Sequence, residues 1–336
     1  MKRHAVLLGE SGRHAIASVY AGGTMEELKQ LVELYPDVID RTNLEQHREA
    51  AARAEFAFST WGMCAFTPEE IRTYFPRLKA VFYAAGSVQG FARPFLECGV
   101  DVFSAWAANA IPVAEFAAAQ ILLANKGYFQ SVVKYRRGGY HDARSYSLRH
   151  PGNYDTRVGI LGAGMIGKKV IELLKPHRLE IAVFDPFLPD EKAKELNVFK
   201  TDLEYIFTHC HTISNHLANN AQTVGMLNKK YFRLMQPYAT FINTGRGAQV
   251  VEADLIEALR EVPTRTALLD VTDPEPAAQD SEWHKLDNVF LTPHIAGSQG
   301  QEVIRMARFM IDECRNYLTG QPLRYRVTPD MLATMA

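Results

Sequence analysis

The sequence predicts an α/β protein built from doubly wound parallel sheets, and three observations support this fold class. Short apolar runs such as 5–8 and 80–85 alternate with helical patterns such as 68–75. One later run, 158–161, ends in a glycine-rich turn, and the next, 181–185, ends in an acidic residue. Alternation of this kind is typical of parallel sheets covered by helices on both faces. At 336 residues the chain is long enough for two such lobes, each Rossmann-like or flavodoxin-like.

The first lobe is expected to begin the chain. Its predicted strands are 5–8, 56–60, 80–85 and 100–105, and its predicted helices are 25–35 and 68–75. A long helix at 111–126 follows, and then a polar stretch rich in Gly, Tyr and Arg reaches Tyr154. This stretch includes the basic segment 134–149, which we interpret as a solvated arm or a subunit contact in preference to a nucleic-acid patch.

The second lobe begins only after that stretch. Its predicted strands are 158–161, 181–185, 212–216, 240–243, 266–271 and 288–291. A last helix, 301–318, is expected to return to the first lobe, which makes that lobe discontinuous. The predicted domains are therefore 1–108 with 299–336, and 109–298.

Three glycines after the strand 158–161 have the spacing of a dinucleotide-binding turn. Gly162 permits the tight turn, Gly164 lets the backbone approach a pyrophosphate, and Gly167 lets the next helix pack against the sheet. That helix begins near Met165 and offers free N–H groups and a positive dipole end to phosphates. A glycine-rich turn alone is weak evidence, but here a strand precedes it and a helix follows.

Asp185 at the end of the next strand indicates which dinucleotide binds. Its carboxylate can accept hydrogen bonds from a ribose diol, whereas it would repel a 2′-phosphate by roughly 4 kcal/mol per unit charge at about 4 Å. Pro186 and Phe187 follow it, so no Arg is placed to receive such a phosphate. NAD is therefore predicted in preference to NADP.

Three polar residues follow successive strands of the same lobe. Arg246, Glu275 and His294 all lie shortly after predicted strands, where ligands bind in open α/β sheets. Arg can make a paired contact with a substrate carboxylate and carbonyl, His exchanges a proton near neutral pH, and Glu can hold the imidazole. Singly, each has an ordinary structural explanation: a capping Arg, a loop Glu between prolines, a structural His after Pro. Together they predict a hydride-transfer site.

Composition excludes other classes of protein. The formal net charge is −1, which predicts no general attraction to nucleic acid or anionic membranes. No run reaches the roughly 18 apolar residues of a membrane span, and the apolar run after the basic residues 1–4 is too short for a signal peptide. The four cysteines show no CxxC pairing, so we predict neither a metal site nor a disulfide framework and expect a cytoplasmic protein. The run 209–211, His-Cys-His, is interpreted as a helix end, with a metal site as the alternative.

The segments 162–167, 243–247, 269–276 and 291–298 together resemble the D-isomer-specific 2-hydroxyacid dehydrogenase family, and the likeness extends from the first lobe nearly to the C-terminus. The resemblance implies an NAD-dependent enzyme that interconverts small D-2-hydroxy acids and 2-oxo acids. It places the family's catalytic Arg, Glu and His on Arg246, Glu275 and His294. It makes 109–298 the NAD-binding domain and the discontinuous lobe the substrate-binding domain, and it implies a homodimer built by the long helix and the arm after it.

The resemblance also implies further site residues. On the cofactor side, backbone N–H groups of Met165 and Ile166 would bind the pyrophosphate, Asp270 the nicotinamide carboxamide, and His216 and Thr244 would lie against the cofactor. The family's substrate-binding turn falls on Gly86, Ser87 and Val88, and Asn109 matches the entry to the long helix. Trp61, after a strand of the first lobe, either faces the substrate or belongs to the core.

The chain departs from the family pattern in places. His216-Leu217-Ala218 stands where the family often has His-Leu-Pro, and Gly86-Ser87-Val88 stands where it has a Gly-Val-Gly-like turn. The second departure alters the predicted substrate pocket. Two alternative functions remain: a formate or phosphite dehydrogenase, against which Glu275 argues because the formate group has Gln there, and an NADH-sensing binding protein similar to corepressors of this fold.

Overall fold

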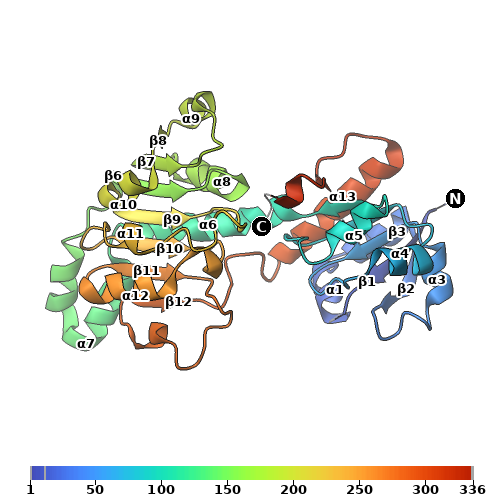
Figure 1. Cartoon of the computed structure of the whole chain (residues 1–336), viewed down its shortest axis with the longest axis horizontal. Helices are drawn as coiled ribbons and strands as arrows, with labels where there is room; N and C mark the ends of the chain where they lie inside the picture. The colour runs from blue at the N-terminus through green and yellow to red at the C-terminus, as the bar shows by residue number, and fades with distance from the viewer. Residues whose placement is uncertain (1, 11–12, 334–336) are drawn as a thin grey trace. The chain divides into compact units, whose positions relative to one another are not determined.

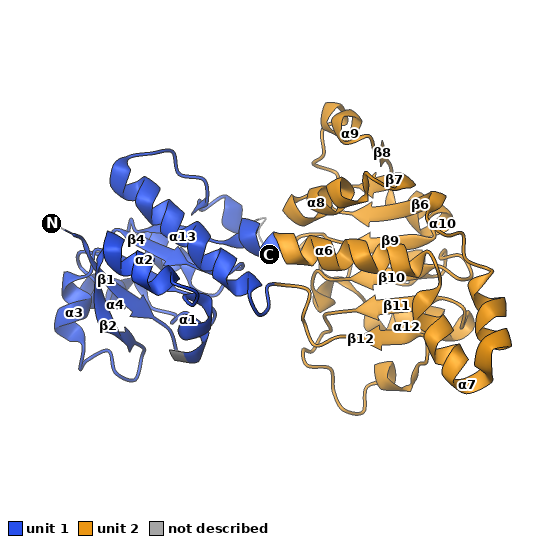
Figure 2. Cartoon of the chain, turned by 180° about the vertical axis from the view of Figure 1, so that it is seen from behind, with its two compact units in different colours: residues 1–110, 298–336 blue, residues 111–297 orange. Residues whose placement is uncertain are grey.

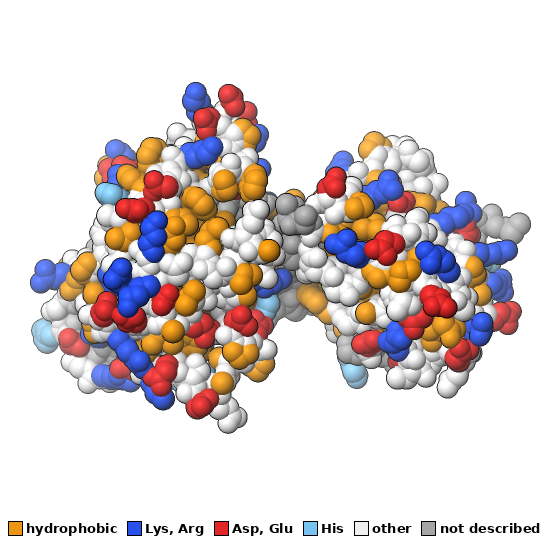
Figure 3. Space-filling model, viewed as in Figure 1, with side chains coloured by type: hydrophobic (Ala, Val, Ile, Leu, Met, Phe, Trp, Pro, Cys, Tyr) orange, Lys and Arg blue, Asp and Glu red, His pale blue; other side chains and the backbone are white. Residues whose placement is uncertain are grey.

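The structure, a computed structural model, describes residues 2–10 and 13–333. It divides into two compact units (Figure 2): unit 1 comprises residues 1–110 and 298–336, and unit 2 comprises residues 111–297. Both contain a mainly parallel sheet with helices (Figure 1), so the predicted α/β class is confirmed. On the face shown in Figure 3, acidic and basic side chains are interspersed over each unit.

Unit 1 has a six-stranded sheet in the order β13-β5-β4-β3-β1-β2. The strands are β1 (His4–Leu8), β2 (Glu33–Ile39), β3 (Phe56–Ser59), β4 (Ala80–Tyr83), β5 (Asp101–Ser104) and β13 (Arg326–Val327), and only β13 is antiparallel to its neighbour. The first five strands have the flavodoxin-like order, in which the order of strands along the sheet reverses between β1 and β3. Ligands of such sheets bind beyond the carboxyl ends of the strands at that point.

The helices of unit 1 form two packed groups. The helices are α1 (Arg13–Val19), α2 (Thr24–Leu31), α3 (Arg48–Arg53), α4 (Pro68–Tyr74), α5 (Ala92–Glu97) and α13 (Glu302–Thr319). α1 and α2 pack against α13, and α4 packs against both α3 and α5. Right-handed crossovers place these two groups on opposite faces of the sheet. The predicted return of the last helix to the first lobe is observed in α13.

One predicted helix extends too far at its C-terminal end. The helix expected at 25–35 is α2, which ends at Leu31, and Leu34 already pairs with Ala5 in the strand β2. Tyr35 precedes Pro36, and the proline ring disfavours a helical conformation at the residue before it. An extended conformation there allows the chain to pair with β1.

Unit 2 has a seven-stranded sheet in the order β12-β11-β10-β9-β6-β7-β8. The strands are β6 (Tyr154–Leu161), β7 (Arg178–Phe184), β8 (Phe199–Lys200), β9 (Thr212–Asn215), β10 (Thr240–Asn243), β11 (Thr266–Leu269) and β12 (Val289–Leu291), all parallel. The order of strands along the sheet reverses between β6 and β9, as in Rossmann folds. The residues after β6 and β9 are therefore the expected binding site for a dinucleotide.

Two apolar cores lie against this sheet. The helices are α6 (Trp106–Ala124), α7 (Tyr128–Ser147), α8 (Met165–Leu174), α9 (Asp190–Leu196), α10 (Leu203–His209), α11 (Lys229–Phe232) and α12 (Glu252–Glu261). Side chains of α6, α8 and α9 share one buried cluster, and those of α10, α11 and α12 share the other. Among the described helices, α6 alone is long and apolar enough to cross a membrane by length and composition. Its residues Ala114, Ala117 and Ile121 are buried in the first of these clusters, as in a core helix.

The polar stretch expected before Tyr154 is helical. It forms α7, which is interrupted at Gly139, where φ is 78° and ψ is −167°. The side chains of Gln130 and Tyr146 donate hydrogen bonds to carbonyl oxygens of residues 264 and 265, just before β11. These contacts hold both halves of α7 against the sheet, which composition alone did not predict.

Candidate active site

The glycine-rich turn of unit 2 forms a cradle after β6. Gly162 has a φ of 89°, and a Cβ there would lie 2.8 Å from the carbonyl oxygen of His216, after β9. A Cβ on Gly167 would lie 1.9 Å from the carbonyl oxygen of Gly162, whereas a Cβ on Gly164 would meet no atom within 4 Å. Gly162 and Gly167 are thus required by packing within the protein. Gly164 borders open space at the N-terminus of α8, which suits a pyrophosphate.

Asp185, directly after β7, closes one side of this cradle. Its carboxylate accepts hydrogen bonds from the backbone N–H of Ala163 at 2.7 Å and from that of Phe187 at 2.8 Å. The carboxylate is therefore held beside the glycine-rich turn, and each of its oxygens keeps a further lone pair for another donor. This position fits a ribose diol next to the pyrophosphate.

Two buried polar atoms near the strand ends have no hydrogen-bond partner within the described residues. They are Nδ1 of His216, after β9, and Oγ1 of Thr244, after β10. The other ring nitrogen of His216, Nε2, lies 2.9 Å from the hydroxyl of Ser214, and burial lowers the pKa of the imidazole to about 4. Both residues are predicted cofactor contacts. With the glycine cradle, these unpartnered atoms are consistent with a polar ligand such as NAD.

The loop that carries Arg246 is supported by a buried amide network. Asn243 bridges it, since its Oδ1 accepts from Gly245 N–H and its Nδ2 donates to the carbonyl of Arg246. Asn215 donates to Asn243 and to Gln249, and Gln249 donates to the carbonyls of residues 217 and 218. Sequence reasoning missed Asn215 and Gln249 as site residues. The signal available was an Asn at the end of an apolar strand, where an unpaired amide is costly to bury.

Arg246 itself is partly buried. Its Nη1 donates to the carbonyl of Gly245 at 2.8 Å. Burial lowers the pKa of the guanidinium, and the smaller effect of the Glu275 carboxylate raises it. Arg246 therefore remains a cation whose other N–H donors can bind an anion.

His294 and Glu275 form a direct pair. Nδ1 of the imidazole lies 2.6 Å from Oε1 of the carboxylate, and both side chains are more than a third exposed. A carboxylate accepts the Nδ1–H, so Nε2 is the nitrogen that can exchange a proton with another molecule. The structure thus brings His294 and Glu275 into direct contact, and it places Arg246 after β10 on the same unit.

Asp270 fixes the backbone that carries His294. His294 has a φ of 54°, which is uncommon for a residue other than glycine. Its N–H donates to the Asp270 carbonyl, and the carboxylate of Asp270 accepts from the N–H groups of Ile295 and Ala296 and from the hydroxyl of Thr292. Such a left-handed residue persists only where its surroundings hold it, and such positions cluster at functional sites. A contact of Asp270 with nicotinamide stays a prediction.

The run 209–211 divides into three different environments. His209 stacks on Tyr205 and its Nδ1 lies 3.0 Å from the Tyr205 carbonyl, while Cys210 is buried and its pKa is raised to about 12 by burial. The His211 ring lies edge-on to His150. Within residues 2–10 and 13–333, no group of three His, Cys, Asp or Glu side chains could hold a metal ion.

In unit 1, the predicted substrate turn follows β4. Ser104 donates to the carbonyls of residues 85 and 86, which fixes the turn, and Gly86 lies close enough to Asn109 that a Cβ would sit 3.4 Å from its Nδ2. Ser87 is exposed and Val88 is buried. Asn109 also accepts the N–H of Ser298, so it joins the two ends of unit 1 that border unit 2 in the sequence.

Trp61 follows β3 of unit 1. Its side chain is 40% exposed, which removes the alternative of a core aromatic. Whether it contacts a substrate stays a prediction.

Comparison with known proteins gives the family. Residues 118–296 match the model of the D-isomer specific 2-hydroxyacid dehydrogenase, NAD binding domain. The chain is 29% identical to D-3-phosphoglycerate dehydrogenase of Archaeoglobus fulgidus over 68% of this chain and 43% of that protein. It is 31% identical to glyoxylate/hydroxypyruvate reductase A of Salmonella typhi over 66% of this chain and 71% of that protein. The matches span about half or less of the phosphoglycerate dehydrogenases, 43% in Archaeoglobus fulgidus and 55% in Methanocaldococcus jannaschii.

Solved structures show the same fold over nearly the whole chain. A phosphoglycerate oxidoreductase from Rhizobium etli has a TM-score of 0.81 at 19% identity and covers 99% of this chain and 100% of its own. The apo D-mandelate dehydrogenase of Rhodotorula graminis has a TM-score of 0.78 at 21% identity and covers 97% of this chain and 98% of its own. The family model confirms NAD as the cofactor of the matched domain. The chain belongs to the D-isomer-specific 2-hydroxyacid dehydrogenase family.

Proposed function

We propose that this chain catalyses the NAD-dependent interconversion of a small D-2-hydroxy acid and its 2-oxo acid. The observation that carries the proposal is the pair of His294 and Glu275, 2.6 Å apart, in loops after β11 and β12 of the NAD-binding domain, with Arg246 in the loop after β10. Family membership supports it, and so does the similarity to a D-3-phosphoglycerate dehydrogenase and a glyoxylate/hydroxypyruvate reductase.

The three side chains divide the work of the reduction. Arg246 pairs with the substrate carboxylate and the carbonyl oxygen, so it orients the substrate and draws electron density toward that oxygen. When bound, NADH would supply a hydride to C2. His294 gives the proton from Nε2 to the oxygen, and Glu275 holds the ring through Nδ1 and stabilises the imidazolium before transfer. Oxidation of the hydroxy acid follows the same path in reverse.

The cofactor contacts follow from the cradle. The pyrophosphate would lie at Gly164 and accept hydrogen bonds from the N–H groups of Met165 and Ile166, while Gly162 and Gly167 keep the turn and α8 close to the sheet. Asp185 binds the adenosine ribose. His216 and Thr244 lie against the dinucleotide, and Asp270 binds the carboxamide.

Unit 1 takes the substrate-binding role in this proposal. The turn Gly86, Ser87 and Val88, in which Ser87 is exposed, would present backbone N–H groups to the substrate carboxylate, and Trp61 would contact the rest of the substrate. This turn departs from the family's usual Gly-Val-Gly pattern, so we expect it to determine which substrate binds.

A panel of 2-oxo acids with NADH and NADPH in parallel tests the proposal. We expect steady oxidation of NADH with at least one acid, a preference for NADH, and loss of turnover in His294→Ala. Formate or phosphite oxidation without 2-oxo acid reduction would favour the one-centre dehydrogenase alternative. Tight NADH binding with no turnover of any acid would favour the corepressor-like binding protein.

We also propose a homodimer in the cytoplasm, with α7 in the subunit contact. Tyr128, Tyr135 and Tyr140 are each about half exposed on this helix, and they border an apolar groove of about 470 Å³. A second copy of the chain is the expected occupant, since exposed aromatic clusters mark protein contacts. Light scattering should give twice the 37.7 kDa chain mass, and Tyr135→Glu should give the monomer.

A further inference from the structure

Trp61 stands where unit 1 is expected to receive a ligand. It lies two residues after β3, and the sheet order reverses between β1 and β3, the position at which sheets of this order bind ligands. The carbonyl of Gly62 accepts the N–H of Glu10, at the end of β1, at 2.6 Å. Trp61 therefore lies next to the position at which the strand order reverses.

Trp61 also lies beside the predicted substrate turn. β3 and β4 pair in parallel with Ser59 opposite Tyr83, and Thr60 Oγ1 donates to the carbonyl of Ala84 at 2.9 Å. β3 ends at Ser59 and β4 at Tyr83, so Trp61 and the turn 86–88 follow neighbouring strands at the same edge of the sheet. Parallel strands lie about 4.8 Å apart, so the indole can reach a group held by that turn.

The loops after β3, β4 and β5 offer no cation to balance a phosphate, and the first cation after β1 is Arg13, at the start of α1. No Lys or Arg occurs in the segments 60–66, 84–91 or 105–110, which follow β3, β4 and β5. Glu10 is near enough to raise the pKa of Cys64, although burial is the larger cause. This edge therefore offers an exposed indole and an acidic residue next to the predicted substrate turn.

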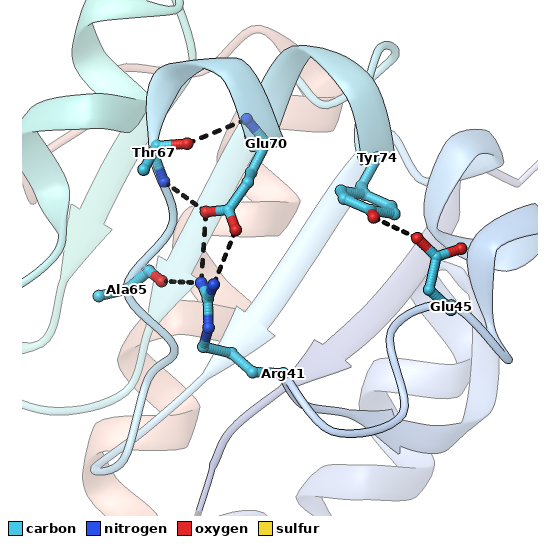
Figure 4. Close-up of polar contacts among 6 residues, drawn as sticks. All are labelled: Arg41, Glu45, Ala65, Thr67, Glu70 and Tyr74. Atoms are coloured by element: carbon cyan, nitrogen blue, oxygen red, sulfur yellow. Dashed lines mark hydrogen bonds and ion pairs between the residues drawn. The ribbon is translucent and has the colours of Figure 1, made fainter.

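Arg41, the cation that follows β2, is already bound (Figure 4). Its guanidinium donates to both carboxylate oxygens of Glu70, at 2.7 and 3.3 Å, and to the carbonyl of Ala65 at 2.6 Å. Glu70 in turn caps α4, where it exchanges hydrogen bonds with Thr67. Release of Arg41 toward a phosphate would break a bidentate ion pair and a helix cap together.

We infer that the substrate carries an uncharged aromatic or bulky apolar group beyond C2, packed on Trp61, and not a phosphate. The inference rests on the proposed function and names its substrate class. It separates this chain from the phosphoglycerate dehydrogenases to which it is similar. An indole provides apolar area and a π face but no charge to balance a phosphate, and Glu10 opposes one.

The test compares phenylpyruvate, 4-methyl-2-oxopentanoate, glyoxylate and 3-phosphohydroxypyruvate as substrates of the full chain with NADH. We expect kcat/KM for phenylpyruvate to exceed that for 3-phosphohydroxypyruvate by about a hundredfold or more. Trp61→Ala should lower kcat/KM for the two bulky acids by about tenfold and leave glyoxylate within about threefold, because glyoxylate has no group to pack there. Trp61→Arg should raise the relative rate with the phosphorylated acid.

Leu318→Ala, which truncates another exposed side chain of unit 1, is the matched control and should change no ratio between substrates. Two results would overturn the inference: a wild-type preference for 3-phosphohydroxypyruvate, or an equal loss for glyoxylate and phenylpyruvate in Trp61→Ala. In either case NADH is still oxidised, so the proposed function stands. Absence of turnover with every acid refutes the proposed function itself, and the inference with it.

Discussion

Nδ1 of His294 lies 2.6 Å from Oε1 of Glu275, although the two residues come from different loops at the carboxyl end of the sheet of unit 2. The contact fixes the tautomer and the orientation of the imidazole in advance of substrate binding. The carboxylate of Asp270 accepts hydrogen bonds from the backbone of the loop that carries His294. The imidazole of His294 is therefore positioned by two acids, one that contacts the ring and one that binds the backbone of its loop.

His294→Ala should lower kcat by about 10²–10⁴-fold, the usual contribution of a positioned acid or base. Glu275→Gln should lower it less, because an amide oxygen still accepts the Nδ1–H but carries no charge to stabilise the imidazolium. Steady-state rates with the best 2-oxo acid measure both effects. His177→Ala, which removes an exposed histidine, is the control. A His294→Ala enzyme as fast as wild type would remove His294 from the mechanism.

Arg246→Lys should raise KM and lower kcat together, with kcat/KM down by about 10²-fold, because an ammonium cannot make the paired contact of a guanidinium. Arg233→Lys, at an exposed arginine of the same unit, should be neutral. A change confined to KM would mean that Arg246 binds the substrate but does not polarise its carbonyl.

Gly164→Ala and Gly167→Ala should separate cofactor binding from folding. The new methyl group at 164 meets no protein atom within 4 Å, so Tm should stay unchanged while the Kd for NADH rises by about tenfold or more. The methyl group at 167 would collide with the Gly162 carbonyl, so that variant should also lose about 1–3 kcal/mol of stability. NADH titration and thermal melts measure the two effects. Wild-type NADH affinity in Gly164→Ala would show that the pyrophosphate does not approach Gly164.

Asp185→Asn should narrow the preference for NADH over NADPH by about tenfold, because it removes the charge that repels a 2′-phosphate. The amide oxygen can still accept the Ala163 N–H, and only the N–H of the exposed Phe187 loses its acceptor, so the fold should be kept. The ratio of kcat/KM for the two cofactors measures the effect, and Asp287→Asn, at an exposed aspartate of the same unit, serves as control. An unchanged ratio would place the discriminating group elsewhere.

His211 should make the protein sensitive to acid. Burial, and secondarily the charge of His150, lowers its pKa to about 4 in the folded state, against 6.5 for an ordinary histidine. Above pH 6.5 both folded and unfolded states hold it neutral. As the pH falls from 6.5 toward 4, only the unfolded state takes up the proton, so stability declines by up to about 3 kcal/mol.

Thermal melts across this pH range compare wild type with His211→Gln, which should show a shallower fall in Tm. His177→Gln, at an exposed position, should follow the wild type. Identical slopes in all three proteins would mean that His211 is protonated in the folded state as well.

The sequence predicted the fold class and the proposed catalytic trio because local patterns indicate both. Gly162 and Asp185 directly follow an apolar run and Arg246 lies three residues after one, and parallel strands bring such positions to one edge of a sheet. The short strands β8 and β13, with two residues each, left no such pattern. Their conformation comes from pairing with β7 and β5.

By itself, therefore, the sequence predicted which residues would carry the proposed chemistry, since glycine, carboxylate and imidazole must stand at fixed positions relative to the strands. Only the tertiary structure decided what holds them in place. The amides of Asn215 and Gln249, the carboxylate of Asp270 and the helical conformation of α7 depend on partners distant in sequence. Hydrogen bonds and burial between such segments form only when the chain is folded, so no local pattern could reveal them.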